Sequence, residues 1–117
     1  MLGTLAFLVV LVFIAVYQKT DQKPEVVFLN VGQGDSILVI LPGDIQILID
    51  GGPSDKISAK LSGYMPFYDK DIDLVILTHP HNDHLNGLIS VFKDYNVKNF
   101  IWSGANYESK LYSNFIE

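Results

Sequence analysis

The sequence predicts an α/β fold, in which a mixed β-sheet carries packed helices, preceded by an N-terminal transmembrane helix. Three observations support this class. From residue 26 onwards, short apolar runs rich in Val and Ile alternate with Gly, Pro and Asp, which is typical of strands and turns. A strand–helix–strand order follows these first strands, and that combination is typical of an α/β domain with a mixed sheet. Finally, the first 17 residues contain no charged side chain.

The N-terminal segment is the apolar run MLGTLAFLVVLVFIAVY, residues 1–17. As a helix, residues 2–17 would extend about 24 Å, which is short of the roughly 30 Å of a bilayer core. The run lacks a basic N-terminal region and a small-residue cleavage site, so an uncleaved anchor is favoured over a secretory signal. A buried helix of a soluble core is a third interpretation, disfavoured because no polar face breaks the run.

The chain divides into a transmembrane anchor or signal-like segment at residues 1–17, a linker at 18–24 and one domain at 25–117. The linker QKTDQKP is polar and ends in a proline, which is typical of a boundary. Strands are expected at residues 26–31, 36–41, 45–50, 73–78 and 97–102, the first three as an antiparallel meander and the fourth buried on both faces. Helical structure is expected at residues 55–65, at residues 84–95 and from about Tyr107.

Composition excludes several kinds of site. The formal net charge is −5 and all eight basic residues are lysines, which argues against tight binding of nucleic acid through its phosphates alone. A nuclease whose bound metal ions supply the positive charge is still compatible with this balance. The chain has no cysteine, so disulfides, thiolate zinc sites and cysteine nucleophiles are all excluded.

All three histidines of the chain lie within six consecutive residues, in the stretch LTHPHNDHLNGL at 77–88. A polar turn alone does not explain three histidines and an aspartate in the pattern H-x-H-x-D-H, so a metal site is favoured. Pro80 favours extended backbone around it, and alternate side chains of an extended segment point the same way. His79 and His81 are therefore expected to face one side.

Asn82 is expected to cap the following helix, with Asp83 and His84 in its first turn. One loop can thus offer two histidines to one ion, and a carboxylate with a histidine to a second. Imidazole and carboxylate donors without sulfur suit zinc, with manganese or iron as alternatives. Two ions about 3.5–4 Å apart would generate a hydroxide at neutral pH, and Asp83 would orient the water and take its proton.

The stretch THPHNDH resembles the H-x-H-x-D-H signature of the metallo-β-lactamase superfamily, and LIDGG precedes it at the end of a strand. More narrowly, FLNVGQGDSILV, LIDGG and THPHNDHLNGL together resemble the hydrolase domain of ComEC-type proteins, which serve DNA uptake in competence. The resemblance covers about residues 25–117 and implies a metallo-β-lactamase-like fold, as the first half of an αββα sandwich.

The resemblance also implies roles for individual residues. His79 and His81 would hold one divalent ion, and Asp83 and His84 a second, with Asp83 as the catalytic residue. Asp50, in LIDGG, would lie next to the site and orient a ligating imidazole.

Members of this superfamily complete the site with a further histidine, a bridging aspartate and a last histidine downstream. No histidine follows His84 here, so we expect a piece of a longer protein that binds metal weakly and catalyses poorly or not at all by itself. Gln33 and Asp35 are only candidates to line the site, because a simple hairpin turn is the stronger explanation of VGQGDS.

The leading hypothesis is a membrane-anchored, metal-dependent hydrolase that acts on phosphodiesters such as single-stranded DNA. One alternative keeps the fold with a lactone, thioester or β-lactam substrate, and another is a non-catalytic truncated domain. The N-terminal helix would bind the membrane. The ComEC resemblance implies a domain outside the cytoplasm, whereas Lys19 and Lys23 after the apolar segment favour a cytoplasmic one.

Overall fold

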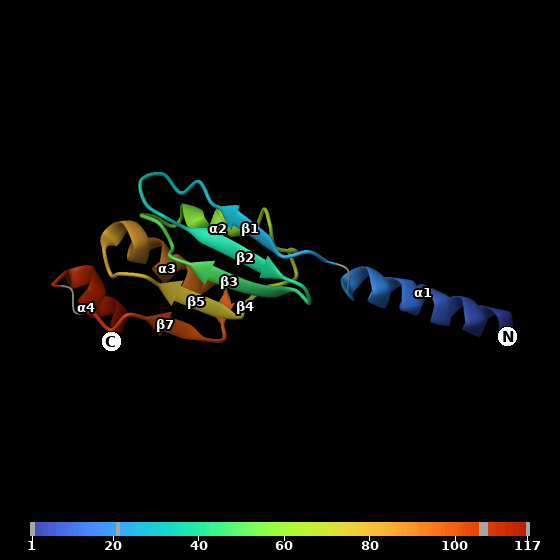
Figure 1. Ribbon diagram of the computed structural model, residues 1–117. Helices are drawn as coiled ribbons and strands as arrows, with labels where there is room; N and C mark the ends of the chain where they lie inside the picture. Colours follow the sequence, from blue (N-terminus) through green and yellow to red (C-terminus); the bar gives the residue numbers. More distant parts are fainter. Residues whose placement is uncertain (1, 21, 106–107, 117) are drawn as a thin grey trace.

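A five-stranded mixed sheet with helices on one face forms the body of the protein (Figure 1). The computed structural model describes residues 2–20, 22–105 and 108–116. The elements in chain order are α1 (Leu2–Thr20), β1 (Glu25–Phe28), β2 (Ile37–Leu41), β3 (Ile45–Ile49), α2 (Lys56–Leu61), β4 (Asp71–Ile72), β5 (Leu74–Leu77), α3 (Asn82–Asp94), β6 (Asn96–Val97), β7 (Phe100–Trp102) and α4 (Lys110–Ile116). The predicted α/β class with a mixed sheet is confirmed.

The main sheet has the strand order β1–β2–β3–β5–β7. Its first three strands pair antiparallel, with Val27 opposite Leu38 and Leu38 opposite Leu48, so the predicted meander is confirmed. Strand β5 joins β3 in parallel, and β7 joins β5 in parallel. A parallel connection needs a crossover, which the segment containing α2 supplies for the first pair and α3 for the second. Strands β3 and β5 therefore end at the same edge of the sheet.

The predicted strand at residues 97–102 is two strands. Its first part belongs to β6, which pairs with β4 in a separate two-stranded sheet, and its last part forms β7. The change of partner occurs at Lys98, whose amide donates to the carbonyl of Ile72, and at Asn99, whose carbonyl accepts from the amide of Val75, each at 2.9 Å. Hydropathy alone did not predict this change because only Lys98 and Asn99 separate Val97 from the apolar residues of β7, so the stretch resembles one strand.

Helix α3 begins earlier than predicted. His81, rather than Asn82, occupies the N-cap position, with an extended backbone and without a capping hydrogen bond from its side chain. The reason lies in the backbone, because the carbonyl of His81 accepts hydrogen bonds from the amides of His84 and Leu85 at 3.0 and 2.9 Å.

The last predicted helix was expected to begin near Tyr107. Tyr107 lies outside the described residues, and α4 is described from Lys110.

The hydrophobic core lies between the sheet and the helices α2 and α3. Leu38, Leu48 and Val75, which the strand pairing places on one face, have no exposed surface. They share one apolar cluster with Ile57 of α2 and Leu88 of α3. Burial of each such side chain contributes about 1.5–3 kcal/mol to folding, so this layer fixes α3 against the sheet.

The opposite face of the main sheet is apolar and open. The strand pairing places only apolar residues on it, namely Val26, Phe28, Ile37, Val39, Leu41, Ile45, Ile47, Ile49, Leu74, Ile76 and Ile101. None of them is buried in the described structure, and Phe28 is 78% exposed. The prediction that residues 73–78 are buried on both faces is therefore wrong for this chain, since Val75 and Leu77 are buried but Leu74 and Ile76 are only partly covered.

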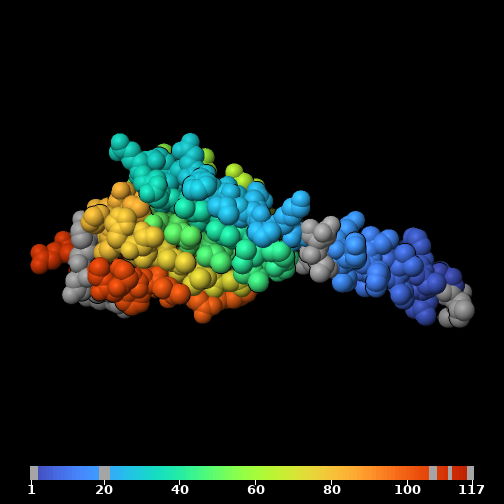
Figure 2. Space-filling view, viewed as in Figure 1, coloured from blue at the N-terminus to red at the C-terminus, as the bar shows by residue number. Residues whose placement is uncertain are grey.

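Helix α1 projects from the domain, as Figure 2 shows. Its described side chains, residues 3–18, are all exposed, with Phe7 at 64% and Phe13 at 72%. An N-terminal helix is therefore present, but the prediction that it spans a membrane is not supported. Among the residues that the structure describes, no helix combines the length and the apolar character needed to cross a bilayer.

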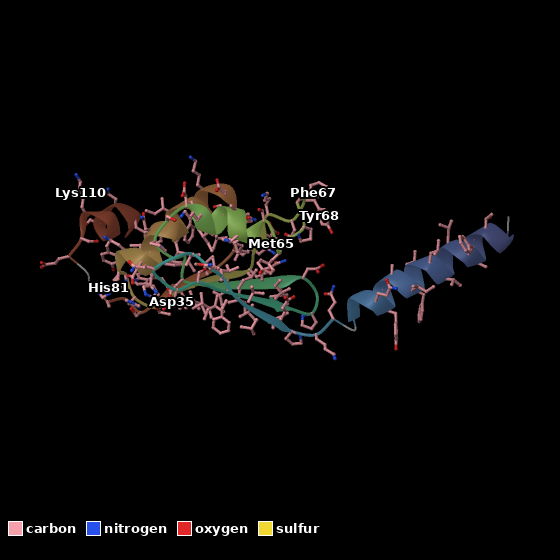
Figure 3. The ribbon with its side chains drawn as sticks, turned by 90° about the horizontal axis from the view of Figure 1, so that it is seen from above. Asp35, Met65, Phe67, Tyr68, His81 and Lys110 are labelled. Carbon is pink, nitrogen blue, oxygen red and sulfur yellow. The ribbon has the colours of Figure 1, made fainter. Side chains whose placement is uncertain are left out.

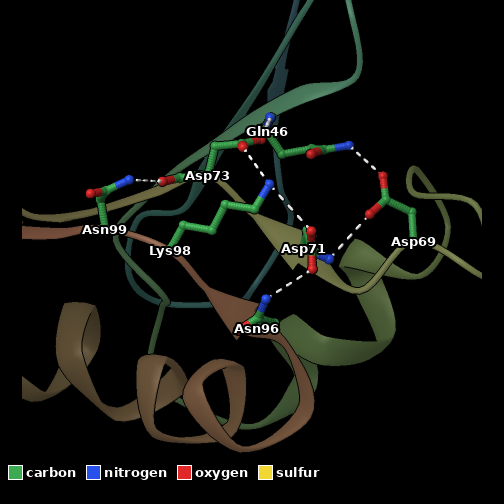
Figure 4. Close-up of polar contacts among 7 residues, drawn as sticks. All are labelled: Gln46, Asp69, Asp71, Asp73, Asn96, Lys98 and Asn99. Carbon is green, nitrogen blue, oxygen red and sulfur yellow. Dashed lines mark hydrogen bonds and ion pairs between the residues drawn. The ribbon is translucent and has the colours of Figure 1, made fainter.

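A polar cluster ties the small sheet to the main sheet (Figure 4). The ammonium of Lys98 lies 2.9 Å from Oδ1 of Asp73 and 3.2 Å from Oδ2 of Asp71. The other oxygen of Asp73 accepts the backbone amide of Gln46 at 2.9 Å, and the side-chain amide of Gln46 donates to Asp69 at 2.9 Å. The acidic stretch that contains these aspartates is thus bound to its surroundings by directed contacts.

Candidate metal centre

The histidine cluster lies at the edge where the parallel strands β3 and β5 end. Asp50 follows β3 directly, Thr78 follows β5 directly, and the segment from Thr78 to His84 leads into α3. The loop between β1 and β2 reaches the same edge, and Figure 3 shows Asp35 of this loop and His81 together at the end of the domain opposite α1. The sheet thus brings three separate segments of the chain to one edge.

His79, Asp83 and His84 form a compact group of metal-ligand atoms. One donor atom from each lies within 4.8 Å of the others. The rings of His79 and His84 are 3.8 Å apart between centroids, and Nε2 of His84 lies 3.7 Å from Oδ2 of Asp83. His84 is buried, with 6% of its surface exposed, whereas Asp83 is open to solvent. The segment before α3 and the first turn of α3 therefore bring three donors close together near the surface.

His81 is close to this group without being part of it. Its ring contacts that of His79 edge to face at a centroid distance of 4.8 Å, and the residue is exposed. The predicted division, with His79 and His81 on one ion and Asp83 and His84 on another, stays a prediction, since the described side chains show only which donor atoms lie close together. They place His79 with Asp83 and His84, because the turn into α3 directs His84 back against His79.

Asp50 is the buried acceptor beneath the site, with 3% of its surface exposed. Its Oδ2 lies 2.8 Å from Nδ1 of His84 and 2.6 Å from the hydroxyl of Thr78, and its Oδ1 accepts the amide of Thr78 at 2.8 Å. The position next to a ligating imidazole is the one that the resemblance implies for this residue. Asp50 has a φ of 59°, in the left-handed region that Asp tolerates better than most residues, which aims its carboxylate at the start of α3.

Two glycines allow α3 to approach the turn that holds Asp50. A Cβ on Gly87 would lie 1.8 Å from the carbonyl oxygen of Gly51, so no side chain fits between the two backbones. The amide of Gly51 donates to the carbonyl of His84 at 2.8 Å, and the amide of Gly87 donates to the carbonyl of Gly52 at 2.9 Å. The glycines of LIDGG and of HLNGL therefore belong to one contact, which fixes His84 above Asp50.

The loop at residues 32–35 packs against the same place. A Cβ on Gly34 would lie 2.2 Å from the carbonyl oxygen of Asp83, and the carbonyl of Asp35 accepts the amide of Gly52 at 3.1 Å. The side chain of Asp35 is exposed, as is that of Gln33. The loop thus lies beside Asp83, where its exposed side chains border the site.

The donor set fits a divalent cation. It contains imidazole and carboxylate donors and no sulfur, which suits zinc and related ions. A carboxylate against the second ring nitrogen, as Asp50 lies against His84, is the usual companion of a histidine that ligates a metal. The sequence analysis assigned no role to Thr78. Its position directly before the first histidine is the sequence feature that could have indicated a role at the site.

The sequence of this chain is similar to those of known proteins. The sequence model of the Metallo-beta-lactamase superfamily matches residues 29–104, more than half of the chain. The chain is similar to the Bacillus subtilis (strain 168) protein called "Probable metallo-hydrolase YqjP", with 42% identity over 65 residues that cover 52% of this chain and 20% of that protein. It is also similar to the solved structure of the Rm3 metallo-beta-lactamase, with 33% identity, a TM-score of 0.46, and coverage of 69% of this chain and 32% of that one.

The chain thus spans about a fifth to a third of the length of these two relatives. The superfamily match includes Asp50, the whole histidine cluster and the strands that carry them. On this match, the chain belongs to the Metallo-beta-lactamase superfamily.

Proposed function

We propose that this chain carries part of the active site of a metal-dependent hydrolase that acts on phosphodiesters, as ComEC-type proteins do. One observation carries the hydrolase part of the proposal. The donor atoms of His79, Asp83 and His84 converge within 4.8 Å, and Asp50 holds the second nitrogen of His84. Membership of the superfamily supports the same conclusion, as does the name of the B. subtilis relative, a probable metallo-hydrolase.

In this proposal His79, Asp83 and His84 hold a divalent ion, with zinc as the first choice and manganese or iron as alternatives. A bound ion would supply a Lewis acid and a water molecule of lowered pKa. The side chain of Asp83 is 53% exposed, so a water molecule can reach its carboxylate, which would orient this water and accept its proton. His81, beside His79, is the candidate ligand for a second ion.

The glycine-rich loop supports the phosphodiester part of the proposal. Its sequence, VGQGDS, is the part that resembles ComEC-type proteins, and Gly34 lies against the backbone of Asp83. A substrate held at Asp83 would therefore meet the exposed side chains of Gln33 and Asp35. Since Asp35 is acidic and the chain carries a net charge of −5, a bound cation would reduce the repulsion of an anionic substrate.

Metal binding is the first test. Competition for zinc against a chromophoric chelator should show binding by the chain and its loss in His84→Ala. The matched control is Asn86→Ala, which alters an exposed residue of the same helix whose side chain donates to the carbonyl of Pro53. Binding that is equal in the native chain, His84→Ala and Asn86→Ala would overturn the metal site.

Substrate class is the second test. The zinc-loaded chain should cleave a phosphodiester such as bis(p-nitrophenyl) phosphate or single-stranded DNA, however slowly, and should lose this activity in Asp83→Asn. Cleavage of nitrocefin or an acyl-lactone, without cleavage of either phosphodiester, would select the alternative of a hydrolase for other esters, lactones or β-lactams. Zinc binding without hydrolysis of any of them would select the non-catalytic alternative.

Membrane attachment through α1 and a location of the domain outside the cytoplasm stay predictions. The exposed apolar side chains of α1 give a reason to test attachment. Flotation of the chain with lipid vesicles measures it, with a variant that lacks residues 1–20 as the control. Protease accessibility in intact and lysed cells distinguishes the two sides of the membrane.

A further inference from the structure

Thr78 contacts both the buried carboxylate and the first histidine of the cluster. Its backbone amide donates to Oδ1 of Asp50 at 2.8 Å. Its hydroxyl oxygen lies 2.6 Å from Oδ2 of Asp50 and 2.9 Å from Nδ1 of His79. One hydroxyl group therefore stands between Asp50 and His79.

The direction of these hydrogen bonds follows from donor and acceptor counting. An ionised carboxylate can only accept, so the hydroxyl of Thr78 donates its single proton to Asp50. The hydroxyl oxygen can then only accept from His79, which requires the proton of the neutral imidazole on Nδ1. Nε2 of His79 is left with a free lone pair, as a metal ligand needs.

We propose that Thr78 is a positioning residue that selects the Nδ1–H tautomer of His79 and thereby presents Nε2 as a ligand. His84 reaches the same state by a shorter route, because its Nδ1 contacts Oδ2 of Asp50 directly at 2.8 Å. A single buried carboxylate thus sets the tautomer of both imidazoles, one directly and the other through Thr78. The effect on metal affinity rests on the proposed function, whereas the tautomer does not.

The fold explains why a threonine can do this. Thr78 is the residue after β5, and its amide bond to Asp50 joins the ends of two neighbouring parallel strands. The hydroxyl is therefore held in place by the sheet and not by the loop that follows. Since Thr78 is an exposed residue, water can replace a missing hydroxyl in part, and we expect the loss of the hydroxyl to weaken the site without abolishing it.

The test uses two variants of nearly the same shape. Thr78→Val removes the hydroxyl but keeps the β-branch and the amide bond to Asp50, and Thr78→Ser keeps the hydroxyl. Long-range ¹H–¹⁵N correlation spectra of the metal-free, histidine-labelled chain are recorded at about pH 8, above the ordinary pKa of histidine. We expect His79 in the Nδ1–H form in the native chain and in Thr78→Ser, and a shift towards Nε2–H in Thr78→Val.

His84 is the internal control, because Asp50 holds it directly. Its tautomer should be the same in all three proteins, which also shows that Thr78→Val is folded. An Nε2–H form of His79 in the native chain, or an unchanged tautomer in Thr78→Val with His84 intact, overturns the proposal.

Zinc affinity gives a second measurement. Chelator competition should show a loss of roughly tenfold in Thr78→Val, as for other residues that orient metal ligands, and near-native affinity in Thr78→Ser. A chain that binds no zinc but shows the expected tautomers contradicts the proposed function and leaves the role of Thr78 supported. A chain that binds zinc equally well with Thr78→Val, and whose His79 tautomer is unchanged, contradicts the role of Thr78 and leaves the proposed function standing.

Discussion

Asp50 and His84 are 34 residues apart in the sequence, yet Oδ2 of the carboxylate lies 2.8 Å from Nδ1 of the imidazole, and both side chains are buried. Strand β3 delivers the first residue and helix α3 the second. The backbone contact between Gly51 and Gly87 keeps the two elements close enough for the bond to form. The buried carboxylate thus fixes the ring of His84 from beneath the histidine cluster.

Replacement of Asp50 by asparagine should lower zinc affinity. Three donors converge on this carboxylate, from the ring of His84 and from the amide and hydroxyl of Thr78, whereas an asparagine amide offers one oxygen and directs its NH₂ group at the rest. We expect a loss of roughly 10–100-fold in affinity, measured by chelator competition. Asp94→Asn, at the exposed end of α3, is the matched control and should bind as the native chain does; equal losses in both variants would contradict a specific role for Asp50.

Substitution of Gly87 by alanine should unfold the packing between α3 and the Asp50 turn. The added Cβ would lie 1.8 Å from the carbonyl oxygen of Gly51 and 2.9 Å from that of Ser54, and backbone atoms cannot rotate away. We expect a loss of about 1–3 kcal/mol in the free energy of unfolding, measured by urea denaturation. In the control Gly63→Ala the nearest atom, the carbonyl oxygen of Lys60, is 3.3 Å away, so the change should be much smaller.

The cluster around Lys98 should make stability depend on pH. The hydrogen bond from Lys98 and then that from the Gln46 amide hold the pKa of Asp73 below its usual 3.8, and the bonds from Asn96 and then Lys98 do the same for Asp71. Hydrogen bonds to Asp73 and then Asp71 raise the pKa of Lys98 above its usual 10.5. The carboxyl contribution is fully present above pH 3.8 and is lost as pH falls through the lowered values in the folded state. The lysine contribution is present below pH 10.5 and is lost as pH rises through the raised value.

Lys98→Met should therefore destabilise the chain most between about pH 4 and pH 10, with a difference from the native chain that shrinks in stronger acid. Urea denaturation at a series of pH values measures this difference. Lys23→Met removes the same charge from the linker, outside the cluster, and serves as the control. A difference between native and Lys98→Met that is constant with pH would show that the ion pairs do not produce it.

The open apolar face of the sheet should cause the chain to associate with itself. A contiguous apolar surface of this kind favours contact with another surface over contact with water. Sedimentation of the native chain should show a mass that rises with concentration, and Phe28→Ser should reduce this rise. Phe67→Ser is the matched control, because Phe67 is 90% exposed but lies in the loop between α2 and β4. An equal effect of the two substitutions would show that exposed apolar side chains in general, and not this face of the sheet, cause the association.

The sequence predicted those features that depend on neighbouring residues. Runs such as SILVIL gave the strands of the meander, and the spacing of Leu85 and Leu88 gave helix α3. It failed where the outcome depends on distant partners. The chain changes sheets after Lys98 because the amide of Lys98 donates to Ile72 of β4, whereas the carbonyl of Asn99 accepts from Val75 of β5. His81 takes the cap position because its carbonyl accepts the amides of His84 and Leu85. Neither contact can be predicted from the hydropathy of the sequence.

The same distinction applies to the site. The four residues of the signature and Asp50 were named from their pattern, and the structure brings His79, Asp83 and His84 together with Asp50 beneath them. Their roles as metal ligands stay predictions. The contact through Thr78 was missed because it depends on the pairing of β3 with β5, which places residues 28 positions apart within hydrogen-bond distance.

The domain has two structurally distinct ends because β3 and β5 run in the same direction. The polypeptide enters from α1 at the end where β1 starts, and the histidines stand at the end where β3 and β5 stop (Figures 1 and 3). Strand β3 has five residues, and an extended strand of this length is about 17 Å long, which is roughly the distance between the two ends. Anything to which α1 is attached is therefore held at the end of the domain opposite the histidines.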